Sequence, residues 1–451
     1  MNYTEIFRGT AFTSDSSKEV RILSDCLFCI GSNGMIEKII TPENEEYLAL
    51  IEVYEGKDNY HCLADGQYFL PGFVDTHVHA PQWAQSGTAL DLPLSDWLNT
   101  YTFPIESKFS DLHFAHEVYE DVVRTLLANG TTTALYFATI HKEASILLAE
   151  ICAKQGQRGL VGKVVMDDLT QNPPYYRDED TQAALAETEE FILTVKELSK
   201  TTKQGVYPVV TPRFIPSCTD EVLKGLGALA AKYDTHIQSH CSESDWAHSF
   251  VKERFNKSDA VSLHNFGLLR TKSVMAHCNF LEEKDVELFA ETGTAISHCP
   301  VSNAYFANSV LPVAHFHAKG VDIGLGSDLS GGFSPSLYDN IRQSVMSSRM
   351  LEDGVNPSLP ATLRGLSNSR LTINEAFYFA TAGGGDSLSL PIGRLEPNYT
   401  WDVQVIDTAI KTAKLPIFND TLQDVFEKII YQVRPENIRE VWVQGQKVHS
   451  R

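Results

Sequence analysis

The sequence predicts an α/β protein, with a TIM-like (β/α)8 barrel and a small β-sandwich domain formed from both chain ends. Strand-like and helix-like segments alternate over residues 71–390. Residues 1–70 and 391–451 instead show short strand-like segments and turn signals, such as Ser32-Asn33-Gly34. We therefore expect a barrel at 71–390 and a composite β-rich domain at 1–70 plus 391–451.

The barrel prediction depends on eight candidate strands with helical patterns between them. One of these helical patterns, Thr219–Lys232, begins beside a capping signal formed by Ser217 and Asp220. Eight β/α units in series favour a closed parallel sheet with helices outside. The candidate strands are Gly72–His79, Thr132–Ala138, Leu160–Met166, Val206–Arg213, His236–His240, Val274–His277, Thr294–His298 and Val321–Gly326.

In the terminal regions, Val441–Val448 reads as a hairpin, and Cys26-Leu27-Phe28-Cys29 forms a CxxC motif. No second CxxC accompanies it and its neighbours are apolar, so we expect buried strand cysteines rather than a metal site. The eight cysteines lack a secretory context, which argues against a disulfide framework. The sequence also has no apolar run of transmembrane length and no leader pattern. Together with the cysteine usage, these features favour a cytoplasmic protein without a membrane partner.

Composition narrows the range of partners. The 451 residues are 43% hydrophobic and 21% charged, which is ordinary globular usage. The net charge of −21 argues against a nucleic-acid partner, because phosphate binding needs a basic face. We therefore expect a small neutral or cationic substrate.

Polar residues stand at the carboxyl ends of several candidate strands, where barrel enzymes place their catalytic groups. His77 and His79 end the first strand and share one face of it; His240 and His277 end the fifth and sixth, and Asp328 follows the eighth. Imidazoles plus a carboxylate suit a divalent ion, most simply zinc. A zinc ion with an open position lowers the pKa of a bound water to about 7.

Residues near these strand ends extend the site. Glu243 lies three residues past His240, where a carboxyl group could shuttle protons. His298 ends the seventh strand and suits either a pocket or a structural role. The fourth strand, Val206–Arg213, has no lysine to bridge a second ion, so one metal is favoured. The long aromatic loop 80–111 is a candidate substrate lid.

Longer motifs around these residues resemble the amidohydrolase superfamily and, within it, the guanine deaminases, over nearly the whole chain. The superfamily pattern comprises Pro71–His79, His240, His277, Asp328 and the run from Gly393-Arg394 to Asp407. The narrower pattern comprises His79-Ala80-Pro81-Gln82, the segment Asp91–Glu106, Pro212-Arg213-Phe214 and His298–Asn303.

The resemblance implies hydrolysis of guanine to xanthine and ammonia, a step of purine catabolism that acts on a cyclic amidine C–N bond, and a homodimer with one Zn²⁺ per chain. It assigns the metal to His77, His79, His240 and Asp328, and substrate binding to Gln82, Arg213 and Phe214. It also implies that His277 positions the attacking water and stabilises the addition intermediate. Glu243 would protonate a ring nitrogen, and Asp328 would accept the proton of the water.

The chemistry of guanine fits this pocket. Adjacent acceptors O6 and N7 match an arginine fork, so Arg213 is the natural reader. Gln82 offers both a donor and an acceptor to the ring edge, and Phe214 offers a stacking face. The alternatives are a structural salt bridge for Arg213 and a core position for Phe214.

Two other functions stay open at this point. One is a different mononuclear zinc amidohydrolase, acting on cytosine, an adenosine derivative or a triazine. The other is a non-catalytic scaffold, although all the site positions are present. The chain also departs from the common pattern at Leu329-Ser330, where Val-Ala is usual, and at Trp401, where a small residue is usual.

Overall fold

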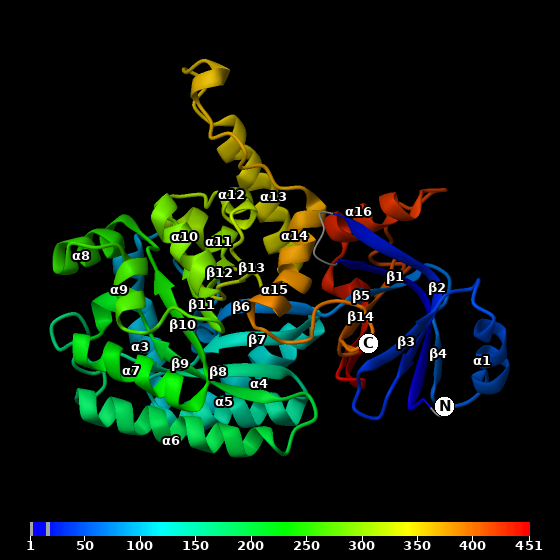
Figure 1. Ribbon diagram of the computed structural model, residues 1–451, viewed down its shortest axis with the longest axis horizontal. Helices are drawn as coiled ribbons and strands as arrows, with labels where there is room; N and C mark the ends of the chain where they lie inside the picture. Colours follow the sequence, from blue (N-terminus) through cyan, green and yellow to red (C-terminus); the bar gives the residue numbers. More distant parts are fainter. Residues whose placement is uncertain (1–2, 15–18) are drawn as a thin grey trace.

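The computed structural model describes residues 3–14 and 19–451, and it confirms the predicted fold class (Figure 1). Eight parallel strands follow one another around the barrel in chain order. All eight overlap the predicted strands, with small differences at the ends. They are β6 (Phe73–His79), β7 (Thr131–Phe137), β8 (Arg158–Val165), β9 (Val206–Pro212), β10 (His236–Cys241), β11 (Ser273–His277), β12 (Ala295–His298) and β13 (Ile323–Leu325).

The barrel closes between its first strand and the segment after its last one. The backbone N–H of Asp328 donates to the carbonyl of His77 at 2.8 Å, and that of His79 donates to the carbonyl of Leu329 at 2.8 Å. β13 is shorter than the predicted Val321–Gly326. The segment after it turns to β6, with a φ of 49° at Asp328. The closure places Asp328 beside the end of β6.

Helices surround the strands, with their apolar faces packed on the barrel (Figure 1). Among the described residues, no helix has the length and apolarity needed to cross a membrane. The main helices of this part are α4 (Leu112–Ala128), α5 (Lys142–Gln155), α6 (Thr181–Ser199), α7 (Asp220–Tyr233), α8 (Asp245–Phe255), α9 (Asp259–Asn265), α10 (Glu283–Thr292), α12 (Val313–Ala318), α13 (Leu337–Asp353), α14 (Ile373–Ala380) and α15 (Ala382–Ser387).

Short helical turns fill the connections at the mouth of the barrel. Most belong to the segment after β6, the candidate lid. In that segment they are η1 (Ala80–Gln85), α2 (Leu94–Trp97), η2 (Leu98–Thr102), α3 (Phe103–Glu106) and η3 (Ser107–Ser110). Elsewhere at the mouth they are η4 (Ile215–Ser217), α11 (Pro300–Ser302) and η5 (Asn303–Ala307). A further turn, η6 (Ala361–Leu363), lies away from the mouth, between α13 and α14.

The two chain ends form one sheet, in the order β16-β15-β14-β5-β1-β2-β3 with β4 paired to β1. The sheet curls over a sandwich-like core, since Phe7 of β1 and Trp442 of β15 meet with ring centroids 4.9 Å apart. Its elements are β1 (Glu5–Ser14), β2 (Val20–Ile30), β3 (Ile36–Ile40), α1 (Glu46–Tyr54), β4 (Tyr60–Cys62), β5 (Gln67–Pro71), β14 (Val403–Asp407), α16 (Leu422–Gln432), η7 (Pro435–Asn437), β15 (Ile438–Val443) and β16 (Gln446–Ser450).

Two smaller predictions in the terminal regions are confirmed. β15 and β16 form the expected hairpin, which pairs antiparallel. Cys26 and Cys29 are buried on β2, and all eight cysteines are free thiols. The exact division at residues 70 and 391 stays a prediction.

A buried ion pair joins the barrel to the terminal sheet. Arg158, the first residue of β8, donates through Nη1 to Asp402 Oδ2 and through Nη2 to Gln444 Oε1 at 2.6 Å. Asp402 also accepts from the backbone N–H of Gln444 at 2.7 Å. Since Arg158 begins its strand, this contact lies at the end of the barrel opposite the mouth.

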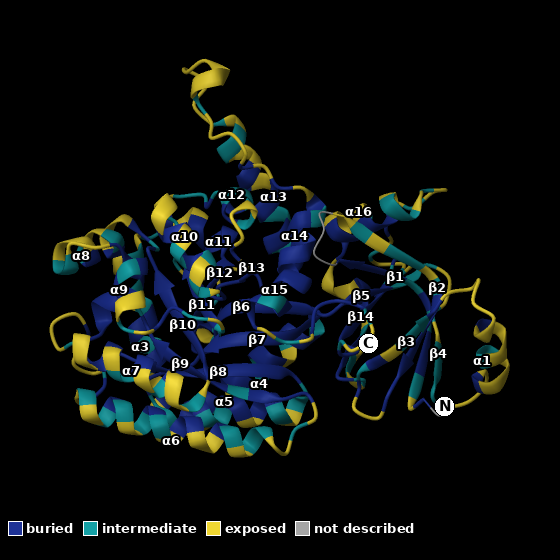
Figure 2. Cartoon of the chain, in the orientation of Figure 1, coloured by how far each residue is buried: buried dark blue, intermediate teal, exposed yellow. Residues whose placement is uncertain are grey.

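An arm, defined as residues 354–370 between α13 and α14, projects away from the rest of the chain (Figure 1). Figure 2 shows that it is almost entirely exposed. Its exposed side chains include Val355, Leu359, Leu363 and Leu366, and α13 adds Met346 and Met350 beside it.

Candidate active site

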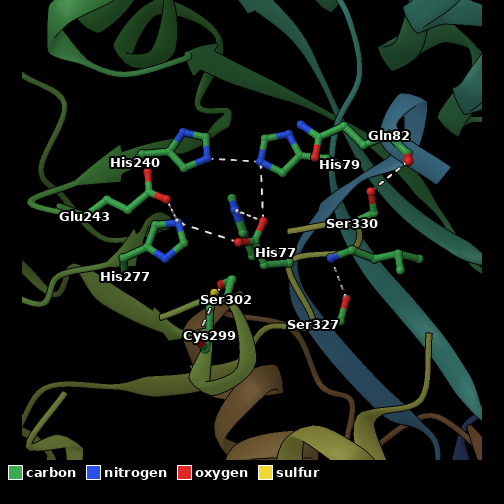
Figure 3. Close-up of polar contacts among 12 residues, drawn as sticks. His77, His79, Gln82, His240, Glu243, His277, Cys299, Ser302, Ser327 and Ser330 are labelled. Atoms are coloured by element: carbon green, nitrogen blue, oxygen red, sulfur yellow. Dashed lines mark hydrogen bonds and ion pairs between the residues drawn. The ribbon is translucent and has the colours of Figure 1, made fainter. Parts of the chain in front are cut away.

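Four histidines and one aspartate, all buried, meet at the mouth of the barrel (Figure 3). His77 Nε2 lies 3.2 Å from Asp328 Oδ1, and His79 Nε2 lies 3.6 Å from the same oxygen. His79 Nε2 also lies 3.0 Å from His240 Nε2. The structure therefore brings together all five predicted residues. Their possible ligand atoms form two groups, His77 with His240 and His277, and His77 with His79 and Asp328.

The protonation of these rings fits a bound cation. The carbonyl oxygen of Arg213 can only accept, so His240 donates to it from Nδ1 at 2.6 Å and presents an unprotonated Nε2 to His79. His77 Nε2 is buried without a hydrogen-bond partner among the described residues. Lone pairs that converge beside a carboxylate are the donor set that zinc prefers, and a carbonyl holding the second ring nitrogen is typical of metal-binding histidines.

The electrostatics of the cluster point the same way. Burial lowers the pKa values of His77, His79 and His240, so these imidazoles are neutral at neutral pH. Burial opposes ionisation of Asp328, but His77 and its neighbours hold the pKa of that carboxyl below its ordinary value. Neutral imidazole and ionised carboxylate are the forms that bind a metal.

Glu243 faces His277, one of the four histidines of the cluster, with its Oε1 3.6 Å from His277 Nε2. Asn303 Oδ1 lies 2.9 Å from His277 Nδ1 and accepts from Asn279 Nδ2 at 3.1 Å. That amide oxygen therefore accepts from His277 Nδ1 as well, and the ring turns its Nε2 towards Glu243. Burial raises the pKa of Glu243. The pair thus places a carboxyl group that keeps its proton to a higher pH beside the Nε2 of His277.

A pocket opens next to the cluster and contains the three predicted substrate-binding residues, Gln82, Arg213 and Phe214. Phe214 is half-buried and its ring lies 5.9 Å from that of Trp246, so it is not a core ring. The other lining residues are His79, Leu94, Trp97, Leu98, His240, Glu243, Trp246, Ala247, Phe306, Asp328 and Gly331. A mostly apolar pocket with a few polar groups can bind a flat ring, and the adjacent metal-type cluster can activate a water to attack it.

Comparisons with known proteins agree with this site. The model of the amidohydrolase family matches residues 68–448. The guanine deaminase of Dictyostelium discoideum is 38% identical over 98% of this chain and 98% of its own, and that of Homo sapiens is 38% identical over 98% and 96%. The chain belongs to the amidohydrolase family, among the guanine deaminases.

A solved structure supports the same placement for this amidohydrolase. The guanine deaminase from C. acetobutylicum, solved with guanine bound in its active site, superposes with a TM-score of 0.87. It is 30% identical, and the match covers 99% of this chain and 100% of that one. A 5'-deoxyadenosine deaminase from Methanocaldococcus jannaschii is less similar, at 26% identity over 82% of this chain.

Sequence reasoning gave no role to Glu106 or Asn303 in this amidohydrolase, although both lie in motifs that it used. Glu106 forms a buried ion pair with Arg213, with 2.7 Å between Oε2 and Nη1. Arg213 is thus both a pocket residue and a member of a salt bridge. His298 is buried, and burial lowers its pKa to about 3. It is not among the residues that line the pocket beside the cluster.

Proposed function

We propose that this chain is a guanine deaminase that hydrolyses guanine to xanthine and ammonia. The observation that carries the proposal is the cluster of His77, His79, His240 and Asp328 opening onto a pocket that holds Arg213 and Gln82. The likeness to guanine deaminases over 98% of the chain supports the same substrate. The product would enter purine catabolism.

We also propose one Zn²⁺ per chain, held by His77, His79, His240 and Asp328. The converging ring nitrogens and the ionised carboxylate support this set. β9 carries no lysine that could bridge a second ion. When bound, the ion supplies Lewis-acid chemistry and a water acidic enough to act as a nucleophile near neutral pH.

The residues of the chain then manage the protons. Glu243 delivers a proton to a ring nitrogen as the ring carbon is attacked. This proton neutralises the negative charge that develops on that nitrogen when the ring loses its aromaticity. Asp328 accepts the proton of the attacking water and passes it towards the leaving amine. His277, held through Nδ1 by Asn303, orients the water with its Nε2 and stabilises the addition intermediate. Arg213 and Gln82 orient the base, and Phe214 packs against it.

A panel of free bases tests the proposal. Ammonia release is measured for guanine, adenine and cytosine and for a triazine, with zinc quantified in the same sample. We expect guanine to have the highest kcat/KM and zinc to be near one equivalent per chain. A higher kcat/KM for another base would refute the substrate. Substoichiometric zinc, with no gain of activity on adding metal, would favour a non-catalytic scaffold.

We propose that the chain forms a homodimer through the arm. The apolar side chains of the arm are widely exposed, Leu363 at 72%, and exposed apolar groups of this kind favour an interface. The arm's two charged residues are both basic. Arg370 pairs with Asp353 at the end of α13, which leaves Arg364 to meet the acidic surface of a second copy in a chain of net charge −21. Sedimentation velocity should show a dimer that Leu363→Asp converts to monomer. Leu48→Asp, at a site 75% exposed on α1, is the control.

A cytoplasmic location completes the proposal. Eight free cysteines suit a reducing compartment. Fractionation of cells that express the chain should recover it with cytosolic markers, and recovery with membranes or in the medium would contradict this location.

A further inference from the structure

Glu106 forms hydrogen bonds with both polar residues that are proposed to bind the substrate, Gln82 and Arg213. Its Oε1 accepts from Gln82 Nε2 at 2.9 Å and from Arg213 Nη2 at 3.2 Å, and its Oε2 accepts from Arg213 Nη1 at 2.7 Å. Glu106 is fully buried and does not line the pocket, whereas Gln82 and Arg213 do. Any effect of Glu106 on a bound base must therefore pass through these two residues.

The contact with Glu106 decides which way the Gln82 amide points. A carboxylate oxygen only accepts, so the group that Gln82 turns towards Glu106 is its NH₂. The amide oxygen is thereby left for the pocket. Ser330 Oγ donates to the Gln82 carbonyl at 2.8 Å and fixes the backbone at the same residue, as Figure 3 shows. Gln82 thus offers the substrate an acceptor.

Arg213 is oriented by α3, the short helix that carries Glu106. The ring of Phe103 on α3 lies 5.1 Å from the guanidinium carbon, and Glu106 on α3 binds the Nη1 and Nη2 end. The Arg213 Nε makes no hydrogen bond to the described residues, so this edge stays available as a donor to the pocket. Burial opposes the charged form of Arg213, but Glu106 outweighs it and the pKa is raised.

We propose that Glu106 is a positioning residue that determines specificity, holding Gln82 as an acceptor and Arg213 as a donor so that the pocket selects a purine with N1–H beside a C6 carbonyl. This inference rests on the proposed function. On the guanine ring, N1 lies between C6, which bears O6, and C2, which bears the amine. With Arg213 at O6 and the metal cluster at C2, the N1–H faces Gln82, which lines the pocket beside His79 and contacts Glu106.

The test compares guanine with 2-aminopurine, which keeps the amine at C2 but has a bare N1 and no O6. In Glu106→Gln the new amide can donate to Gln82, so the Gln82 amide is free to turn its NH₂ to the substrate. We expect the ratio of kcat/KM for guanine over 2-aminopurine to fall by about tenfold or more, the size of one lost matched contact. The loss for guanine should appear mainly in KM, since the contact forms in the bound ground state.

Two further variants keep the test decisive. Asp402→Asn also weakens a buried ion pair, with Arg158 at the opposite end of the barrel, and should leave the ratio unchanged. Gln82→Met keeps the Glu106–Arg213 pair and should lower the ratio as Glu106→Gln does, even if the latter variant fails to fold. Equal losses for both bases in Glu106→Gln, or an unchanged ratio in Gln82→Met, would overturn the inference. If the wild-type protein does not deaminate guanine, the proposed function itself fails.

Discussion

Glu243→Gln removes the carboxyl group that would carry the proton and keeps the size of the side chain. Glu243 Oε1 lies 3.6 Å from His277 Nε2, and burial raises its pKa, so it holds a proton at a higher pH than an ordinary carboxyl group. A positioned acid or base contributes about 10²–10⁴-fold, which is roughly 3–5 kcal/mol of barrier. We expect kcat on guanine to fall by that factor. Zinc content should not change, because Glu243 is outside the proposed ligand set.

The assay is steady-state ammonia release, with zinc measured in each preparation. Glu253→Gln makes the same chemical change at an exposed position of α8 and should retain wild-type turnover. If Glu243→Gln keeps more than about a tenth of wild-type kcat with full zinc, general acid–base catalysis belongs to another group.

Three further predictions concern zinc binding, the pH dependence of stability and the ion pair between the barrel and the terminal sheet. His77→Ala should lose zinc together with activity, and full zinc occupancy by elemental analysis would contradict its role. Burial raises the pKa of Asp259 to about 7, so the folded state loses stability as pH rises from about 4 to 7. Asp259→Asn cannot ionise, and between pH 5 and 8 its free energy of unfolding should gain about 2–3 kcal/mol relative to wild type; a pH-independent difference would contradict this. Arg158→Met strands Asp402 and should cost about 3–5 kcal/mol in denaturant unfolding, whereas the exposed Arg124→Met should cost under about 1 kcal/mol.

The barrel was predictable because its strands are short, most of them are rich in apolar residues, and several end in a histidine. His77 and His79 illustrate this: an apolar strand followed by two histidines at i and i+2 can only project both rings from one face. The position of Asp328 beside them followed from the barrel itself, since closure brings the last strand to the first. Local pattern and global topology together were enough to locate the cluster.

What sequence could not supply were pairings between distant polar residues. Glu106 meets Arg213 across 107 positions, and no periodicity links the two. The arm was equally invisible, because residues 354–370 have neither helical nor strand spacing, and only the fold shows that they leave the body of the protein. Strand ends also shifted where the chain turns, as at β13.

The pairing of β5 with β14 has a consequence for biosynthesis. Residues 67–71 bond to residues 403–407, and the entire barrel is made in between. While the ribosome translates the barrel, one side of β5 has unbonded amides and carbonyls, the kind of template on which nascent chains associate. Translation must pass Asp407 before β14 can cover that edge.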